Sequence, residues 1–217
     1  DEGEPVTIKS KREIKILGIF LDNKLEWTKQ VNNVKKNALN TIRNLHRVRN
    51  LLPVKEKIKL YNTLATPQFN YADVVWGGCG KENTRRLQTA QNFALRSIMN
   101  RKKTDSAKEI LTELKFLNLQ EKRQVHDAVF INKALLHKQS ANITEQYLKY
   151  LPTSNTRFAQ AGKLTIPKHT TSKFENSPLY RTIKTWNTIP TSIPTDNPRT
   201  FKKQYQKHLV HHTHNLP

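Results

Sequence analysis

The sequence predicts a mainly α-helical protein that begins with a short β-hairpin and ends in a helical, partly irregular region. Three observations support this fold class. Residues 14–25 contain a run of strand-forming side chains, interrupted by Gly18 and followed by a turn sequence. Between residues 27 and 100, apolar side chains recur at spacings of three and four, which is the period of an amphipathic helix. Beyond Pro152 the chain is rich in Ser, Thr, Asn and Pro, which favours loops around short helices.

The first predicted helix covers residues 27–49 and has two distinct faces. One side of a helical wheel is apolar and carries Val31, Val34, Ala38, Ile42 and Leu45. The opposite side is basic or amidic and carries Lys29, Lys36, Asn40, Arg43 and Arg47. No acid lies between Glu26 and Glu56, whereas a merely solvated face normally mixes both signs of charge. The basic face therefore favours binding to a polyanion, with a solvated surface as the alternative.

Two further helices complete a predicted antiparallel three-helix bundle. The second runs from Val54 to about Thr66 and ends before Pro67. Its inward face is expected to carry Ile58, Tyr61 and Leu64. The third covers 82–100, with an apolar stripe of Leu87, Ala90, Ala94 and Ile98 and an opposite face of Arg85, Asn92 and Arg96. We expect the centres of the first and third stripes to face each other in the core: Ala38, Ile42, Leu45, Ala90, Ala94 and Ile98.

The pattern restarts after Arg101. Thr104 or Asp105 is expected to cap a helix that carries Ala107, Ile110, Leu111 and Leu114. Further helices are predicted over 119–138, 143–150, 177–188 and 198–211. The expected organisation has four parts: a hairpin at 1–26, the bundle at 27–101, a helical extension at 102–151 and a basic, partly irregular tail at 152–217.

Composition narrows the function. Lys and Arg number 38 against 17 acids, and a formal charge of +21 indicates a polyanionic partner, with nucleic acid as the first candidate. The single cysteine, Cys79, excludes an internal disulfide and favours a reducing, intracellular compartment. No apolar run approaches the roughly 18 residues of a spanning helix, so we expect no membrane partner. The chain begins with Asp1 rather than Met, and we interpret it as a piece of a longer protein.

The segment Tyr71-Ala72-Asp73-Val74 raises the question of catalysis, because reverse transcriptases carry Tyr-x-Asp-Asp at their metal site. Metal-dependent polymerisation needs at least two convergent carboxylates. No two of the six aspartates of this chain are within three residues of each other. We therefore predict no catalytic residue and no metal site, and we expect Tyr71 and Trp76 to pack against the bundle. The glycines at 77, 78 and 80 are expected to mark the exit from packed structure.

Histidines and Cys79 give weaker signals. His208 and His212 have the i,i+4 spacing of zinc ligands, and His211 and His214 lie beside them. No cysteine or carboxylate completes that set, so a basic tail is the favoured interpretation. The other histidines stand alone in the sequence: His46, His126, His137 and His169. Cys79 has no apparent histidine partner for nucleophilic catalysis.

Five blocks, in order over residues 14–210, resemble the C-terminal part of non-LTR (LINE-type) retrotransposon reverse transcriptases. The first is Lys15-Ile16-Leu17-Gly18-Ile19 with Leu21-Asp22 and Leu25-Glu26-Trp27. The second is Leu60-Tyr61 followed by Pro67, Tyr71 and Val75-Trp76, and the third is Leu87-Gln88-Thr89-Ala90-Gln91. The last two are Trp186-Asn187-Thr188-Ile189-Pro190 and Thr200-Phe201-Lys202. Ile16 departs from the pattern, because the family usually has an aromatic residue there.

The resemblance implies that the catalytic aspartates lie upstream and that this chain holds the primer-grip hairpin, the thumb and a C-terminal extension. The parent polypeptide would be an RNA-directed DNA polymerase, with divalent metal only in the missing palm and no cofactor in this fragment. The implied partners are an RNA/DNA primer–template duplex and the upstream palm and fingers of the same polypeptide. A nuclear location is expected if the parent acts at chromosomal targets.

The candidate nucleic-acid contacts are Leu17, Gly18, Lys29, Lys36, Arg43, Arg47, Arg85 and Arg96. An alternative function is a free-standing basic helical adaptor, or a domesticated remnant, that binds RNA or DNA without polymerase activity. A third is a protein-interaction module whose charge only keeps it in solution, which predicts no salt-dependent binding to nucleic acid.

Overall fold

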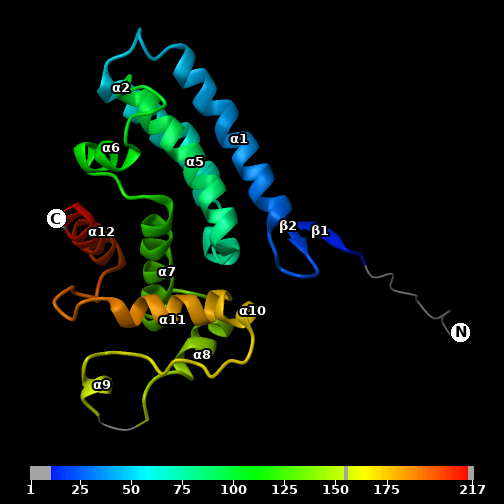
Figure 1. The fold of residues 1–217 in the computed structure, drawn as a ribbon. Coiled ribbons are helices and arrows are strands. Elements are labelled where there is room, and N and C mark those ends of the chain that lie inside the picture. The colour runs from blue at the N-terminus through cyan, green and yellow to red at the C-terminus, as the bar shows by residue number, and fades with distance from the viewer. Residues whose placement is uncertain (1–10, 154–155, 215–217) are drawn as a thin grey trace, which may run out of the picture.

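The computed structural model describes residues 11–153 and 156–214, and there the chain is mainly helical with one two-stranded antiparallel hairpin, as predicted (Figure 1). The N-terminal elements are β1 (Glu13–Ile16), β2 (Ile19–Asp22), α1 (Thr28–Arg47), α2 (Val54–Leu60), the π-helical turn η1 (Tyr61–Ala65), α3 (Thr66–Asn70), α4 (Asp73–Trp76) and α5 (Gly80–Ile98). The C-terminal elements are α6 (Ala107–Leu114), α7 (Leu119–Leu135), α8 (Ala141–Leu148), α9 (Arg157–Gln160), α10 (Ser172–Glu175), α11 (Pro178–Thr188) and α12 (Pro198–His214).

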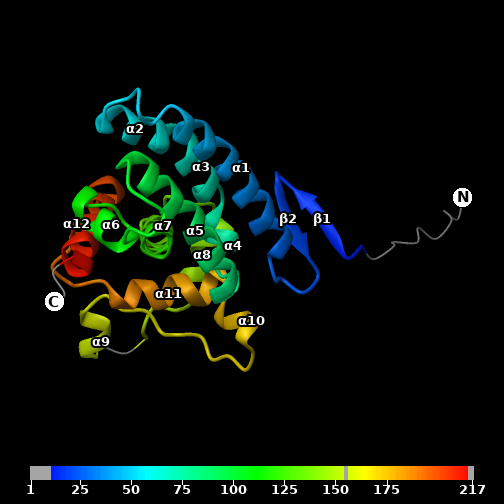
Figure 2. The same ribbon diagram turned by 45° about the horizontal axis from the view of Figure 1, so that its top comes forward.

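The hairpin is closed by a tight turn at Leu17 and Gly18. Ile16 pairs with Ile19, and both turn residues have positive φ, 47° at Leu17 and 84° at Gly18. Such left-handed pairs match the twist of the strands, and glycine accepts the conformation at little cost. The hairpin projects from the N-terminal end of α1, away from α12 (Figure 2).

Asp22 joins the hairpin to α1. Its carboxylate accepts hydrogen bonds from the backbone N–H groups of Lys24, Glu26 and Trp27, at 3.1, 3.0 and 2.8 Å. Gln30, in the first turn of α1, accepts another from the N–H of Phe20 at 3.0 Å. These local bonds fix the angle at which the hairpin leaves the bundle.

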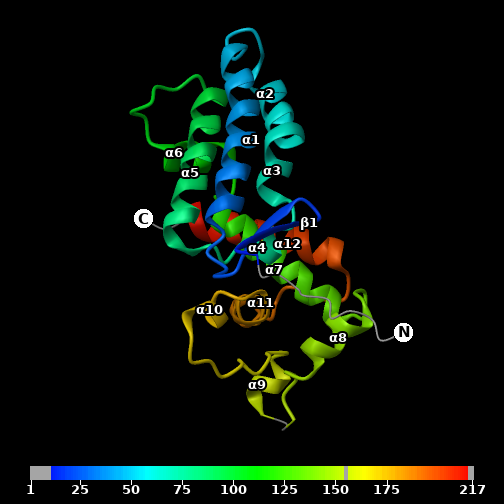
Figure 3. The same cartoon turned by 90° about the vertical axis from the view of Figure 1, so that its right-hand side faces the viewer.

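α1, the α2–η1–α3 segment and α5 form the predicted bundle (Figure 3). α1 and α5 run parallel, because Arg86 bonds to Asn32 near their starts and Ser97 contacts His46 near their ends. The six residues predicted to face each other are all buried in one core: Ala38, Ile42, Leu45, Ala90, Ala94 and Ile98. The period of the sequence was sufficient to predict this core.

The predicted second helix is wrong in its details. Pro67 does not end it, because helical structure continues to Asn70 and Pro67 lies in the first turn of α3, where a missing N–H is tolerated. Leu64 is 50% exposed, whereas Ala65 and Phe69 are buried. The wider π-helical turn shifts the register of the inward face, so a strict 3.6-residue period misplaces these side chains.

The C-terminal helices form a second core. α7, α8, α11 and α12 contribute side chains that include Val125, Ile131, Tyr147, Ile183 and Phe201. Regions 102–151 and 152–217 therefore share this core. The predicted cap of α6 is wrong: Ser106, rather than Thr104 or Asp105, accepts the N–H of Glu109.

The segment after Tyr71 is packed rather than an exit from the fold, which corrects the interpretation of its glycines. α4 carries Trp76 into the first core, where its indole N–H donates to the carbonyl of Tyr71 at 2.8 Å. A Cβ on Gly78 would lie 2.0 Å from the carbonyl oxygen of Asn176. Glycine is therefore required here for the close approach of the C-terminal part of the chain.

Tyr71 does not pack into the bundle as expected. Its side chain is 56% exposed and its hydroxyl donates to the carbonyl of Leu17 at 2.7 Å. The tyrosine thus braces the hairpin turn from the end of α3.

Candidate nucleic-acid interface

The basic face of α1 is an exposed row of cations. Lys36, Arg43 and Arg47 are exposed, and none forms an ion pair with a carboxylate of the described residues. Within the described part of the chain, the only hydrogen bond from these three side chains is a 3.5 Å contact of Arg43 with Asn40. At about 1.5 Å per residue the row extends for roughly 16 Å along the helix. That length matches about five phosphates of one strand at 3.4 Å each along a duplex axis. We call these three residues the α1 row.

Lys29 is not part of this row, because its side chain pairs with an acid of the hairpin. Its ammonium group pairs with Glu13 of β1 and lies 5.0 Å from the centre of the Phe20 ring. These contacts hold the hairpin against the start of α1. Lys29 was predicted from its wheel position, which says nothing about a partner on a neighbouring strand.

Arg85 and Arg96 do not widen the α1 row. Arg85 pairs with Glu82 at 2.9 Å and lines a cleft between α5 and the C-terminal helices. Arg96 donates from Nε to the carbonyl of Asp105 at 2.9 Å and so fixes the loop before α6. α5 places both side chains away from the α1 row, because other residues of α5 pack against α1.

The hairpin turn presents apolar surface. Leu17 is 84% exposed at the tip, and Ile14 and Ile16 on β1 are 41% and 49% exposed. Gly18 is covered in part by the ring of Tyr71, whose nearest carbon would lie 3.6 Å from a Cβ built there. Leu17 and Gly18 therefore offer backbone and apolar contacts rather than charge.

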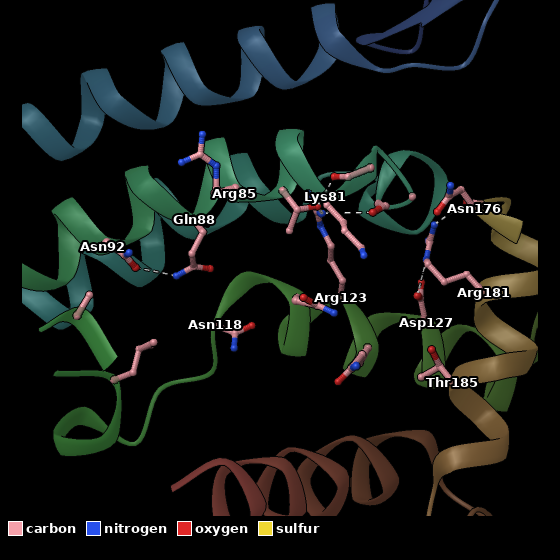
Figure 4. Close-up of a pocket in the computed structure, with 18 of the residues that line it drawn as sticks. Lys81, Arg85, Gln88, Asn92, Asn118, Arg123, Asp127, Asn176, Arg181 and Thr185 are labelled. Carbon is pink, nitrogen blue, oxygen red and sulfur yellow. Dashed lines mark hydrogen bonds and ion pairs between the residues drawn. The ribbon is translucent and has the colours of Figure 1, made fainter. Parts of the chain in front are cut away.

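A cleft of about 640 Å³, lined mainly by polar and charged residues, lies between α5, α6, α7 and α11 (Figure 4). Its cationic lining residues are Lys81, Arg85, Lys108, Arg123 and Arg181, whereas Asp127 is its only acid. Side-chain amides supply much of the remaining lining, including Gln88, Asn118, Gln120 and Gln124. The lining thus carries an excess of positive charge and of hydrogen-bonding groups.

Arg181 is fully engaged by the protein. Its Nε and Nη2 donate to the two carboxylate oxygens of Asp127 at 2.7 and 3.0 Å, and Nη2 also donates to the carbonyl of Val74 at 2.6 Å. Nη1 donates to the carbonyl of Asn176 at 3.3 Å. Burial raises the pKa of Asp127, while the hydrogen bonds from Arg181 act in the opposite direction. Arg181 therefore clamps α11 to α4 and α7.

Arg123 is buried without a carboxylate partner. It is 7% exposed, and no ion pair joins it to an acid among the described residues. Its Nη1 donates to the carbonyl of Gly77 and to Oγ1 of Thr84, both at 3.2 Å, and contacts Sγ of Cys79 at 3.7 Å. The guanidinium also lies 4.8 Å from the ring centre of Trp76. All contacts of the guanidinium with described residues are thus with neutral groups.

Comparisons with protein-family models, curated proteins and solved structures find no match to this chain. Its function is therefore argued from its own residues.

Asp73 is buried in α4 and contacts α7. It is 4% exposed and its carboxylate contacts Nδ1 of His126 at 2.6 Å. His126 therefore does not stand alone, and neither does His46, whose Nδ1 lies 2.9 Å from Oγ of Ser97. Within residues 11–153 and 156–214, no three His, Cys, Asp or Glu side chains are grouped as metal ligands. In the same ranges, no helix is long and apolar enough to cross a bilayer.

The sequence interpretation missed Arg123 and Arg181. The position of Arg123 along α7 was a sequence signal for its burial. Arg123 lies four residues after Leu119 and four before Asp127, so all three share the buried stripe of α7. Charged residues on an apolar stripe indicate a specific partner or site. Arg181 gave no such signal, since Asp127 and Val74, which it joins to α11, are 54 and 107 residues away in the sequence.

Proposed function

We propose that this chain grips a nucleic-acid duplex along α1, as the non-catalytic C-terminal part of a retrotransposon reverse transcriptase. The observation that carries the proposal is the α1 row, three exposed cations on a helix whose opposite face is buried. None of the three pairs with an acid of the described residues. A solvated helix surface usually carries acids among its bases, and this one has none between Glu26 and Glu56.

The mode of contact follows from the side chains. Lysine and arginine on a rigid helix neutralise phosphates and displace condensed counterions, which makes affinity depend steeply on salt. Phosphate contacts carry no base information, so the grip is independent of sequence. Such a grip suits a polymerase thumb, which must follow a duplex of changing sequence.

The hairpin supports the second part of the proposal. Ile14, Ile16 and Leu17 leave apolar surface exposed at the N-terminal side of the bundle. Asp22, Lys29 and Tyr71 hold that surface in a fixed orientation. We propose that it packs against the upstream palm of the same polypeptide, where the catalytic carboxylates and their metal would lie.

Fluorescence anisotropy with a labelled RNA–DNA hybrid tests the duplex grip. Neutralising one phosphate with each of the three cations of the α1 row predicts an affinity that falls about 40-fold between 50 and 200 mM salt. Two hybrids of unrelated sequence should bind alike. Absence of binding at 50 mM salt, or a preference for one sequence that persists at all salt concentrations, would overturn the proposal.

A further inference from the structure

The strongest unexplained feature is the uncompensated charge of Arg123 in the cleft. A buried guanidinium without a counter-charge is costly, because it has lost most of its water. The contact with the Trp76 ring and the hydrogen bonds from Nη1 offset part of that cost. Nε and Nη2 have no acceptor among the described residues, although a guanidinium offers five N–H donors in a planar fork.

Nε and Nη2 lie on the same side of the guanidinium, and together they can donate two parallel hydrogen bonds to one phosphate. Arg123 lines the cleft, and Lys81 and Lys108 line it as well from exposed positions on α5 and α6. Gln120 and Gln124, on the same helix as Arg123, have side-chain amides without a hydrogen-bond partner among the described residues. Donors and acceptors are thus available around one cationic group.

We propose that this cleft binds the phosphate backbone of a single-stranded nucleic-acid segment, with Arg123 as the main phosphate ligand. The inference rests on the proposed function in taking nucleic acid as the ligand, and it assigns a second site, on the other side of α5 from the α1 row. The cleft is of a size that holds a small ligand, at about 640 Å³, and is too small for a duplex.

The lining favours a nucleic-acid backbone over an acidic peptide. Arginine clusters also recognise acidic peptides, but many peptide grooves add apolar pockets for anchor side chains, whereas Ala107 and Leu111 are the main apolar side chains here. No aromatic residue lines the cleft, so stacking on bases does not contribute. Binding should therefore depend on phosphates and be indifferent to base identity.

The test uses the full chain, a labelled single-stranded octanucleotide, inorganic phosphate as competitor and the variant Arg123→Gln. Loss of charge-assisted hydrogen bonds should weaken octanucleotide binding by about 10- to 100-fold. Inorganic phosphate should displace the octanucleotide from the wild type. Because the guanidinium lies against Trp76, phosphate should also change tryptophan emission in the wild type and not in Arg123→Gln.

Circular dichroism establishes whether Arg123→Gln folds. If it does not fold, the double variant Lys81→Gln/Lys108→Gln takes its place, since both side chains are exposed and line the same cleft. The inference would be overturned if a folded variant bound the octanucleotide as tightly as the wild type does. An oligoglutamate peptide that competes as well as the octanucleotide would also overturn it, in favour of an acidic protein partner.

The variant Lys36→Gln/Arg43→Gln/Arg47→Gln separates this inference from the proposed function. It should retain octanucleotide binding in the cleft while losing duplex affinity. Normal duplex binding with no cleft binding would refute only the second site. Cleft binding without any duplex binding would refute only the α1 grip.

Discussion

The variant Ile42→Ala tests the packing that presents the α1 row. Ile42 is 0% exposed and sits in the core between α1 and α5. The substitution removes three carbons, which at about 0.8 kcal/mol each gives about 2.4 kcal/mol for lost burial. Incomplete collapse of the resulting cavity brings the expected loss in the free energy of unfolding to about 2–5 kcal/mol. In a chain of this length each kcal/mol lowers Tm by about 2–4 °C.

Urea denaturation followed by circular dichroism measures this loss. Leu51→Ala is the matched control, because it also removes three carbons but from a side chain that is 80% exposed. We expect the control to change the free energy of unfolding by less than about 0.5 kcal/mol. Equal effects of the two substitutions would show that Ile42 is not in the core, and the assignment of the basic face opposite it would then be wrong.

Four other substitutions probe three separate parts of the fold. Burial lowers the pKa of Lys122 from 10.5 to about 8, so the folded state binds this proton less tightly than the unfolded chain does. The free energy of unfolding should therefore rise with pH between these two values. Lys122→Met should raise the free energy of unfolding at pH 7 and reduce its rise with pH. A variant that urea unfolds more easily than wild type at pH 7 would contradict this. In urea denaturation, Gly78→Ala should destabilise the protein more than Gly80→Ala does. A Cβ at Gly78 would clash with the backbone of Asn176. A Cβ at Gly80 meets no neighbour within 4 Å, so the only cost is that of an alanine at a φ of 78°, about 1–2 kcal/mol. Asn118→Ala removes the capping box of α7 and should lower the free energy of unfolding by about 1 kcal/mol, and no change would show that the cap is unimportant.

The sequence predicted features that depend on neighbouring residues along one helix. Val31, Ala38 and Ile42 repeat at spacings of three and four, so their shared face follows from helix geometry alone. The exposure of Arg43 and Arg47 follows from the same geometry on the opposite face. This reasoning covers the bundle core and the α1 row.

Contacts between distant segments could not be predicted in this way. The pair of Asp73 and His126 joins residues 53 positions apart, and Arg123 reaches Thr84 across 39 positions. A helical wheel places a charge on a face but does not say which other segment covers that face. The cleft depends on such long-range contacts and is therefore visible only in the folded chain.

The π-helical turn is a further limit of periodic patterns. Nothing in Tyr61–Ala65 differs from an ordinary helical sequence, yet the turn there shifts the inward face and exposes Leu64. The glycines at 77 and 78 were interpreted from the sequence as the exit from packed structure, although glycine also permits close approach of another backbone. The carbonyl of Asn176, 2.0 Å from a Cβ at Gly78, decides for close approach.

The slope of log affinity against log salt for a duplex tests the α1 grip most directly. Two variants remove the same charge: Lys36→Gln/Arg43→Gln/Arg47→Gln on α1, and Lys202→Gln/Lys203→Gln/Lys207→Gln at exposed positions of α12. Three lost phosphate contacts at about 0.9 units each should flatten the slope by about 2.7 units in the α1 variant. In the wild type these three contacts make affinity about 40-fold lower at 200 mM than at 50 mM salt, and the α1 variant should lose that dependence. The α12 variant should keep the wild-type slope, and an unchanged slope in the α1 variant, or an equal loss in both, would contradict the proposed grip.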